Sequence, residues 1–406
     1  MIGLFNDCFP PIMDGVSITV QNYARWFSEH DRDICVVTPT VPDRRIVDSQ
    51  HAPLNKQDNY PIYDYLSMPI PLRKPYRMGF PNMDPLFRHT INRIPFDLVH
   101  AHCPFSSGKV ALELSRQQNI PFIATFHSKY RKDFEGAFSN KKVVDYLIRN
   151  VVNFYEQADE VWIPQASVEE TLREYGYKGN VEVVENGNDF VTTEPLIHVR
   201  KQGRRLFGVS KNEVVFLFVG QHIYEKKPDL IIRSLSHLKD SRWKMFFIGR
   251  GNASEELKEL VHNLNLENKI TFLGQISDRD KLRQCYAAAD LFLFPSLYDN
   301  APLVVREAAA MGTPALISAN STTSEVITDG FNGFLAQPEE KAFSMTIEFL
   351  MHNTPLLGRV GENARSTIAR SWSDILEEVH ILFLSIRLEV RYNHLIMRQS
   401  QQSIAV

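Results

Sequence analysis

The sequence predicts an α/β fold in which two doubly wound, Rossmann-like domains face a central cleft. Short apolar runs alternate with amphipathic segments in both halves of the chain, as expected for parallel strands buried between helices on two faces. The pattern stops at about Asp189 and begins again at Val214. The polar segment at 194–205 carries turn signals, and we interpret it as the linker between the domains.

In the first half, a strand at Ile2–Phe5 leads into a Pro/Gly loop and then into a helix at about 16–28. Further short apolar runs predict the other strands of this sheet, at Ile34–Pro39, 97–100, 122–126, 161–164 and 181–184. We expect the first domain to span residues 1–193.

The second half repeats the pattern. Its predicted elements are strands at 214–220, 243–249, 270–273, Leu291–Phe294 and Ala315–Ser318, and a helix at Ser254–Asn263. We expect this domain to span residues 194–374, and an amphipathic helix at 375–398 to cross back to the first domain rather than to anchor the chain in a membrane. Ligands of such sheets bind beyond the carboxyl ends of the strands, so the loops there should carry the chemistry.

The composition is that of an ordinary globular protein, with 44% hydrophobic and 23% charged residues. A formal net charge of -3 gives no case for a nucleic-acid partner. The four cysteines form no CxxC pair, so we expect reduced thiols in a cytoplasmic protein and no zinc site. The chain shows neither a secretory signal nor an apolar run of about 18 residues. Any membrane contact should therefore be peripheral, at the inner face of the cell membrane.

The strongest chemical signal is a pair of acids that follows the predicted strand Leu291–Phe294. Asp299 lies in a loop, and Glu307 follows eight residues later in a helix that starts near Pro302, which places the acids about 12 Å apart. The start of that helix offers N–H groups and a positive dipole end to an anion. Two acids at this spacing are usually just solvated, but the strand before them and the helix around them favour a nucleotide-sugar site.

This segment resembles the E-x7-E element of family four glycosyltransferases, which are retaining enzymes with the GT-B fold. Other stretches resemble the family's motifs in the same order. They are the first glycine loop at 10–16, a strand exit at 97–102, the histidine loop at 124–128, the N-G-V-D turn at 186–189, the donor-phosphate strand and loop at 218–226 and the D-G-x-N-G-x-L turn at 329–335. The resemblance covers nearly the whole chain.

The resemblance implies that the first domain binds the acceptor and the second the nucleotide sugar. Glu307 would bind the ribose hydroxyls, and Asp299 would bind hydroxyls of the transferred sugar. Lys226 would neutralise the diphosphate, Gly15 would let the backbone approach the same phosphates, and His127 would contact the sugar or the leaving phosphate. The expected catalytic residues are His127, Asp299 and Lys226, and the further donor-binding positions are Asp14, Gln221, Asn300, Ala301, Pro302 and Leu303, the N–H groups of 300–303 facing the donor.

The same resemblance implies front-face substitution, in which the leaving phosphate helps to deprotonate the acceptor. No side-chain nucleophile, metal or cofactor is then expected. The donor would be uridine-linked glucose or galactose. Such a reaction requires the anomeric bond to the phosphate oxygen to break while the enzyme stabilises negative charge on the diphosphate.

Three positions depart from the family pattern. Asp299 stands where the family usually has Glu, and Asp14 precedes Gly15 where it has a second glycine. Gln221 follows Gly220 where the family typically has a diphosphate-binding Arg. His222 or Lys227 could supply the missing charge; otherwise the activity would be weak.

The acceptor should lie on the first domain. Residues 70–149 hold 13 Lys and Arg against 6 Asp and Glu, and aromatic residues are interleaved among them. Such a patch suits an anionic membrane surface, although a solvated helix with an apolar inner face would look the same. The candidate acceptor or membrane residues are Lys129, Arg131, Lys132, Lys141 and Lys142, and the excess also includes Arg73 and Lys74. We interpret His100 and His102 as structural hydrogen-bonding residues.

This region is similar to bacterial glycolipid synthases that act on diacylglycerol or ceramide, which implies a lipid hydroxyl acceptor and an α-glycolipid product. Three alternatives stay open. They are a capsule or lipopolysaccharide glycosyltransferase with a sugar acceptor, a nucleotide-sugar epimerase, and a sugar-nucleotide-binding protein without turnover, for which Gln221 is the argument.

Overall fold

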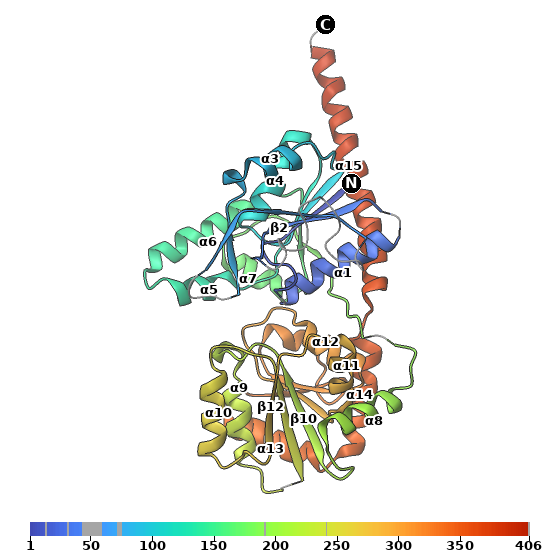
Figure 1. The fold of residues 1–406 in the computed structure, drawn as a ribbon. Helices are drawn as coiled ribbons and strands as arrows, with labels where there is room; N and C mark the ends of the chain where they lie inside the picture. The colour runs from blue at the N-terminus through green and yellow to red at the C-terminus, as the bar shows by residue number, and fades with distance from the viewer. Residues whose placement is uncertain are drawn as a thin grey trace. The chain divides into compact units, whose positions relative to one another are not determined.

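The computed structural model describes residues 1–12, 14–30, 32–42, 59–70, 75–190, 192–240 and 242–404, with side chains up to residue 390. The chain forms two compact units, Met1–Asn186 with Trp372–Val406, and Gly187–Ser371. Unit 1 therefore passes into unit 2 after residue 186 rather than 193, and the chain returns to unit 1 after residue 371 rather than 374. Each unit has its own parallel sheet with helices on both faces (Figure 1).

Unit 1 is built on a seven-stranded parallel sheet in the order β3-β2-β1-β6-β7-β8-β9. Its strands are β1 (Ile2–Phe5), β2 (Ile34–Pro39), β3 (Ile62–Tyr65), β6 (Leu98–Ala101), β7 (Phe122–Thr125), β8 (Glu160–Ile163) and β9 (Glu182–Val183). Its helices are α1 (Gly15–Glu29), α3 (Pro85–Ile91), α4 (Ser106–Gln118), α5 (Tyr130–Ala137), α6 (Lys141–Tyr155), α7 (Val168–Glu174) and α15 (Trp372–Ile404). A two-stranded antiparallel sheet of β4 (Ser67–Pro69) and β5 (Arg77–Gly79) and a 3-10 turn η1 (Pro81–Met83) complete it.

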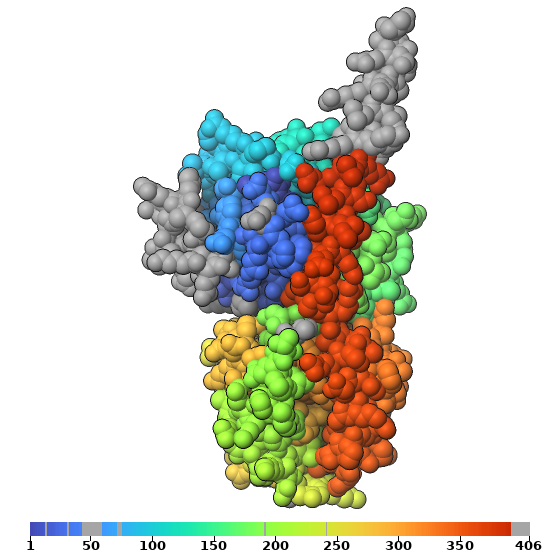
Figure 2. Space-filling view, turned by 90° about the vertical axis from the view of Figure 1, so that its right-hand side faces the viewer, coloured from blue at the N-terminus to red at the C-terminus, as the bar shows by residue number. Residues whose placement is uncertain are grey.

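The C-terminal helix α15 belongs to unit 1, as the sequence predicts. Its apolar stripe, which includes Val379 and Phe383, is buried. The Phe383 ring stacks on Phe27 of α1 at 5.4 Å between centroids, and Trp26 Nε1 donates to Ser373 Oγ at 3.3 Å. The two helices lie side by side on the face shown in Figure 2. Among the helices that the structure describes, none combines the length and the apolar character needed to cross a bilayer.

Unit 2 is built on a six-stranded parallel sheet in the order β12-β11-β10-β13-β14-β15. Its strands are β10 (Val214–Val219), β11 (Trp243–Ile248), β12 (Ile270–Gly274), β13 (Leu291–Phe294), β14 (Ala315–Ser318) and β15 (Phe334–Ala336). Its helices are α8 (Leu196–Phe207), α9 (Pro228–Ser236), α10 (Ser254–Asn263), α11 (Arg279–Ala288), α12 (Leu303–Ala310), α13 (Glu340–Met351) and α14 (Thr354–Thr367), with 3-10 turns η2 (Tyr224–Lys226) and η3 (Thr322–Val326).

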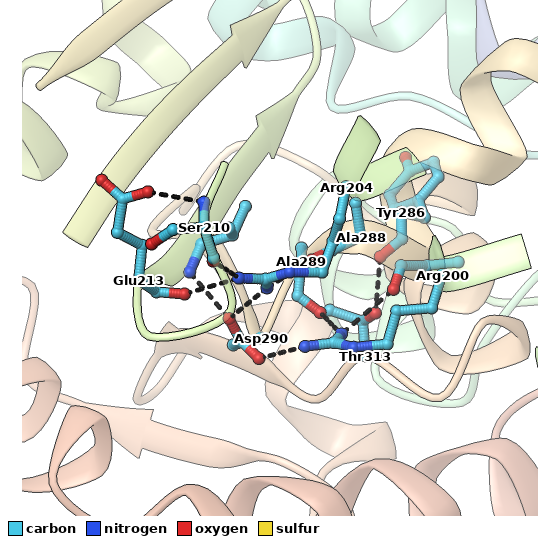
Figure 3. A network of polar contacts seen from close by, with 11 residues as sticks. Arg200, Arg204, Ser210, Glu213, Tyr286, Ala288, Ala289, Asp290 and Thr313 are labelled. Carbon is cyan, nitrogen blue, oxygen red and sulfur yellow. Dashed lines mark hydrogen bonds and ion pairs between the residues drawn. The ribbon is translucent and has the colours of Figure 1, made fainter. Parts of the chain in front are cut away.

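The predicted linker at 194–205 is wrong for most of its length, because α8 occupies it. The arginines of this polar segment lie against the C-terminal end of α11 (Figure 3). Arg200 Nη1 donates to the carbonyl oxygens of Ala287 at 3.1 Å and Ala289 at 2.8 Å. Arg200 and Arg204 both pair with Asp290, which follows α11. Cations are favourable at a helix C-terminus, where the carbonyl groups have no partner within the helix.

Both sheets contain a switch point, where the strand order reverses direction. In unit 1 it lies between β1 and β6, and in unit 2 between β10 and β13. Doubly wound sheets bind their ligands at this point, beyond the carboxyl ends of the strands. The candidate site should therefore be built from the loops after these four strands.

Helix packing predicts opposite effects for two glycines of unit 2. A Cβ at Gly203 in α8 would lie 1.9 Å from the carbonyl oxygen of Gln284 in α11, whereas a Cβ at Gly358 in α14 would meet nothing within 4 Å. We expect Gly203→Ala to lower the free energy of unfolding by about 1–3 kcal/mol. Gly358→Ala, the matched control, should raise it by up to about 1 kcal/mol. Urea unfolding of the two variants measures this, and equal effects would contradict the packing of α8 on α11.

Candidate functional site

A lysine–carboxylate pair spans the switch point of unit 2. Lys226 ends the turn η2 after β10, and Asp299 lies in the loop after β13. Lys226 Nζ is 2.5 Å from Asp299 Oδ1 and lies 5.4 Å from the centroid of the Phe294 ring. Ser296 Oγ donates to Asp299 Oδ2 at 2.7 Å. The structure thus brings together two predicted catalytic residues, and each carboxylate oxygen of Asp299 already has a partner.

The start of α12 lies at the same edge of the sheet. The helix begins at Leu303, with Pro302 as its N-cap residue. Pro302 has no N–H, so the expectation that every residue of 300–303 offers one to the donor is wrong at this position. The first N–H groups of a helix have no intrahelical acceptor and carry a partial positive charge. Together with Lys226 they make this edge suitable for an anion.

Glu307 is buried within α12 at 3% exposure and is held from two directions. Its Oε1 accepts a hydrogen bond from Arg279 Nη2 at 2.6 Å, and its Oε2 accepts one from the Tyr286 hydroxyl at 2.8 Å. Both partners belong to α11. The sequence identified Glu307 but missed these partners, because Arg279 and Tyr286 lie seven residues apart on a helix whose packing against α12 cannot be read from spacing.

His222 is one of the two residues named for the positive charge that Gln221 does not supply. His222 is buried, its Nδ1 lies 3.1 Å from Ser254 Oγ, and burial lowers its pKa to about 4, with a smaller effect from Lys258. It is therefore neutral at physiological pH, which leaves Lys227 as the other residue named for this charge. Cβ atoms at Gly249 and Gly251 would lie 1.9 Å from Gly220 O and 2.2 Å from His222 O, so close backbone packing fixes the loop that holds Gln221.

The first glycine loop of unit 1 has a clear local structure. Asp14 caps α1, because its Oδ1 accepts from Ser17 N at 2.7 Å and Ser17 Oγ accepts from Asp14 N at 2.8 Å. A Cβ at Gly15 would meet nothing within 4 Å. Packing among the described residues thus gives no reason for a glycine there, and its donor role, like that of Asp14, stays a prediction. Met13 of this motif lies outside the described residues.

His127 is half-buried in unit 1 and lies beside the buried histidines His100 and His102. His127 Nε2 lies 3.0 Å from His102 Nδ1, and the ring centroids of His102 and His100 are 4.1 Å apart. His100 Nε2 lies 2.7 Å from Thr125 Oγ1. Burial lowers the pKa of all three, that of His127 to about 4. His127 can therefore exchange hydrogen bonds with a substrate at neutral pH, but it supplies no positive charge.

The basic residues predicted for the acceptor region lie on and beside α5 and α6. Lys132, Lys141 and Lys142 are exposed, whereas Arg131 pairs with Asp145 at 2.8 Å and Lys129 is the half-buried N-cap of α5. Large apolar side chains are exposed beside the lysines, at Phe138, Val143 and Tyr146. Arg73 and Lys74 lie outside the described residues. The described part of the patch is thus both cationic and apolar.

A pocket of about 380 Å³ opens beside the start of α11, with Phe207, Ile276 and Asp278 in its wall. Lys226, Asp299 and Glu307 do not line it. We locate the candidate site by the charged groups at the switch point, because they carry chemistry that this pocket lacks. In the described part of the chain no His, Cys, Asp or Glu residues cluster in a way that could hold a metal.

Two family matches fall on the two halves of the chain. Residues 13–190 match the family described as Glycosyltransferase Family 4, and residues 200–367 match Glycosyl transferases group 1. The chain belongs to the family four glycosyltransferases. Its fold is GT-B: Anabaena HepE in complex with UDP and glucose superposes with a TM-score of 0.75 over 95% of this chain and 99% of that one, at 18% identity.

Two similar proteins are named for different acceptors, diacylglycerol in one and inositol 3-phosphate in the other. Alpha-monoglucosyldiacylglycerol synthase of Streptococcus pneumoniae is 24% identical over 86% of this chain and 78% of its own length. D-inositol 3-phosphate glycosyltransferase of Nocardia farcinica is 26% identical over 89% of this chain and 79% of its own. Glycosyl transfer is thus common to both names, and the named acceptor differs.

Three buried histidines and the half-buried His127 of this glycosyltransferase predict acid sensitivity. Because burial lowers the pKa of His100, His102, His127 and His222 in the folded state, the unfolded chain binds more protons below about pH 6.5. The stability should be complete above that pH and should fall as the pH drops toward 4, by up to about 1.4 kcal/mol per pH unit for each histidine. Urea unfolding at several pH values measures the slope.

His127→Asn removes one of these titrating groups and should reduce the slope by up to about 1.4 kcal/mol per pH unit. His89→Asn, at an exposed histidine of α3, is the control and should change the slope less. Unfolding free energies that do not change between pH 7 and pH 5 would contradict the burial of these rings.

Proposed function

We propose that the protein is a retaining hexosyltransferase that moves glucose or galactose from a UDP-sugar to the hydroxyl of a membrane lipid, diacylglycerol or ceramide, to form an α-glycolipid. The observation that carries the proposal is the arrangement at the switch point of unit 2. A lysine–carboxylate pair and a helix N-terminus lie there, and Glu307 follows in the same helix. The complex of Anabaena HepE with UDP and glucose supports the choice of donor.

On this proposal, donor binding exchanges the partners of Lys226. The diphosphate takes Lys226 as its counter-ion, and the lysine releases Asp299 Oδ1, which then accepts a hydrogen bond from a sugar hydroxyl. Glu307 accepts from the ribose hydroxyls. An exchange of this kind costs less than exposing an unpaired charge, because each charged group keeps a partner throughout.

The transfer step breaks the bond between the anomeric carbon and the phosphate oxygen. Negative charge develops on the departing diphosphate, where Lys226 and the α12 dipole stabilise it. The acceptor hydroxyl attacks from the same face and gives its proton to the leaving phosphate. His127 contacts the sugar as a neutral hydrogen-bonding group, consistent with its lowered pKa.

The lipid acceptor is supported by the surface of unit 1 and by the S. pneumoniae relative. Exposed lysines beside Phe138, Val143 and Tyr146 suit a peripheral contact with anionic lipid headgroups. The N. farcinica relative keeps a soluble acceptor as the second candidate. The proposed place of action is the cytoplasmic face of the cell membrane.

A donor-by-acceptor screen tests the proposal. Radiolabelled UDP-glucose and UDP-galactose, with GDP- and ADP-sugars for comparison, are offered with vesicles of diacylglycerol or ceramide and with water-soluble sugars. We expect transfer from a UDP-hexose to lipid and an α-anomeric product by NMR, while Lys226→Ala and Glu307→Ala lose at least about 100-fold in kcat/KM. A β-linked product would contradict retention, and transfer to soluble sugars alone would contradict the lipid acceptor.

The membrane contact makes a separate prediction. Lys141→Glu/Lys142→Glu should weaken binding to phosphatidylglycerol vesicles by at least about 30-fold, since each lysine near an anionic surface contributes about 1 kcal/mol. Lys201→Glu/Lys211→Glu makes the same charge change at exposed positions of unit 2 and should leave binding unchanged. Vesicle flotation at low and high salt measures both. If the two double variants bind the vesicles equally well, the lysines of α6 have no role in membrane binding.

A further inference from the structure

The Glu307 carboxylate has little freedom to rotate. Both oxygens of Glu307 are engaged, one by Arg279 and one by Tyr286, and the two contacts come from positions two turns apart on α11. A carboxylate held at both oxygens cannot rotate about its last bond without losing one contact. Each oxygen can still accept a second hydrogen bond, since it has two lone pairs.

The Tyr286 hydroxyl acts as a hydrogen-bond donor to Glu307. Its side chain is fully buried, and burial raises the pKa of its phenol well above the usual value, with a further increase from Glu307. The hydroxyl therefore keeps its proton at every physiological pH. Its backbone is also fixed, because Thr313 Oγ1 donates to Tyr286 O at 2.7 Å and Arg200 and Arg204 hold the residues that follow (Figure 3).

Arg279 bridges two carboxylates. Its Nε donates to Asp189 Oδ2 at 2.9 Å, its Nη2 contacts both Asp189 and Glu307, and its guanidinium lies 4.3 Å from the centroid of the Phe190 ring. Burial alone would lower the pKa of Arg279, but the two carboxylates raise it overall. Only a planar group with several fixed donors can hold both acids at once, so lysine would not replace it.

Asp189 in turn is held by the segment around it. Asn188, next to it, donates from both its backbone N and its side-chain Nδ2 to Arg370 O at 2.9 Å, and its Oδ1 accepts from Phe190 N at 3.0 Å. The segment that carries Asp189 is therefore tied to the end of unit 2. A chain of fixed contacts runs from Arg370 through Asn188, Asp189 and Arg279 to Glu307.

From this geometry we infer that Arg279 and Tyr286 are positioning residues for the donor, which aim the two oxygens of Glu307 at the two hydroxyls of a ribose ring, with Asp189 fixing Arg279. The inference rests on the proposed function and deepens it: the site selects a ribonucleotide over its 2′-deoxy counterpart. A site shaped for two hydroxyls discriminates strongly against a ligand that lacks one, because a polar group is then left unpaired.

Binding of UDP and of 2′-deoxy-UDP to the full-length protein, measured by calorimetry, tests the inference. The unmodified protein should prefer UDP clearly. Tyr286→Phe should weaken UDP binding about tenfold and weaken 2′-deoxy-UDP binding less. The ratio of the two dissociation constants should therefore move closer to one. The KM for the UDP-sugar should rise, while kcat at saturating donor stays within about twofold.

Tyr177→Phe is the matched control, since it removes one buried tyrosine hydrogen bond, to Asn180 O at 3.1 Å, in unit 1. It should leave the ratio unchanged. In a Glu307→Gln background, Tyr286→Phe should cause little additional loss, because the two residues act through one contact. Arg279→Lys should lose the preference for UDP over 2′-deoxy-UDP. If only the positive charge of Arg279 mattered, this variant would keep the preference.

Two failures are distinguishable. If the unmodified protein binds none of UDP, GDP and ADP, the proposed function fails, and the inference with it. If it binds UDP but folded Tyr286→Phe, checked by circular dichroism, keeps the original ratio, the positioning role is overturned and the proposed function stands.

Discussion

The buried carboxylate of Glu307 is the constraint around which unit 2 is organised. An ionised carboxylate at 3% exposure is costly unless charged or hydrogen-bonding groups compensate it. Arg279 and Tyr286 provide that compensation, and both come from α11. The helix must therefore keep its register against α12, since a shift of one turn would leave the acid unpaired. On the proposed function, stability and ligand recognition depend on the same three side chains.

That register is secured at both ends of α11. At its start Arg279 is tied to Asp189, and at its end the arginines of α8 hold the last carbonyl groups and Asp290. Asp290 Oδ2 also accepts from Val215 N at 2.8 Å, which links the same turn to β10. The helix that positions Glu307 is thus connected to the strand whose following loop carries Lys226. Lys226 and Glu307 of the candidate site are therefore both positioned by elements that contact Asp290 and α11.

The sequence predicts the sheets well, because strands buried on both faces are continuous apolar runs. Leu291–Phe294 and Ala315–Ser318 agree with the structure at both ends. It misses β3 at Ile62–Tyr65, which carries Asp64 and is half-buried. It also mistakes most of α8 for a linker, because that segment is polar and carries turn signals. Family resemblance points to Lys226, Asp299 and Glu307, but no sequence pattern predicts that Arg279 and Tyr286 contact Glu307. Those contacts depend on how two helices pack, just as the neutrality of His222 depends on burial.

The neutrality of His222 limits how this site can hold a diphosphate. With Gln221 uncharged and His222 neutral, Lys226, the α12 dipole and the neighbouring Lys227 are the sources of positive charge that remain among the groups named for the donor. Lys226 is already paired with Asp299, so on the proposed mechanism Lys226 cannot neutralise the diphosphate unless the carboxylate finds a new partner. The hydroxyl of the transferred sugar is that partner. A nucleotide without its sugar would leave Asp299 with less compensation, which couples recognition of the sugar to recognition of the phosphates through a single lysine.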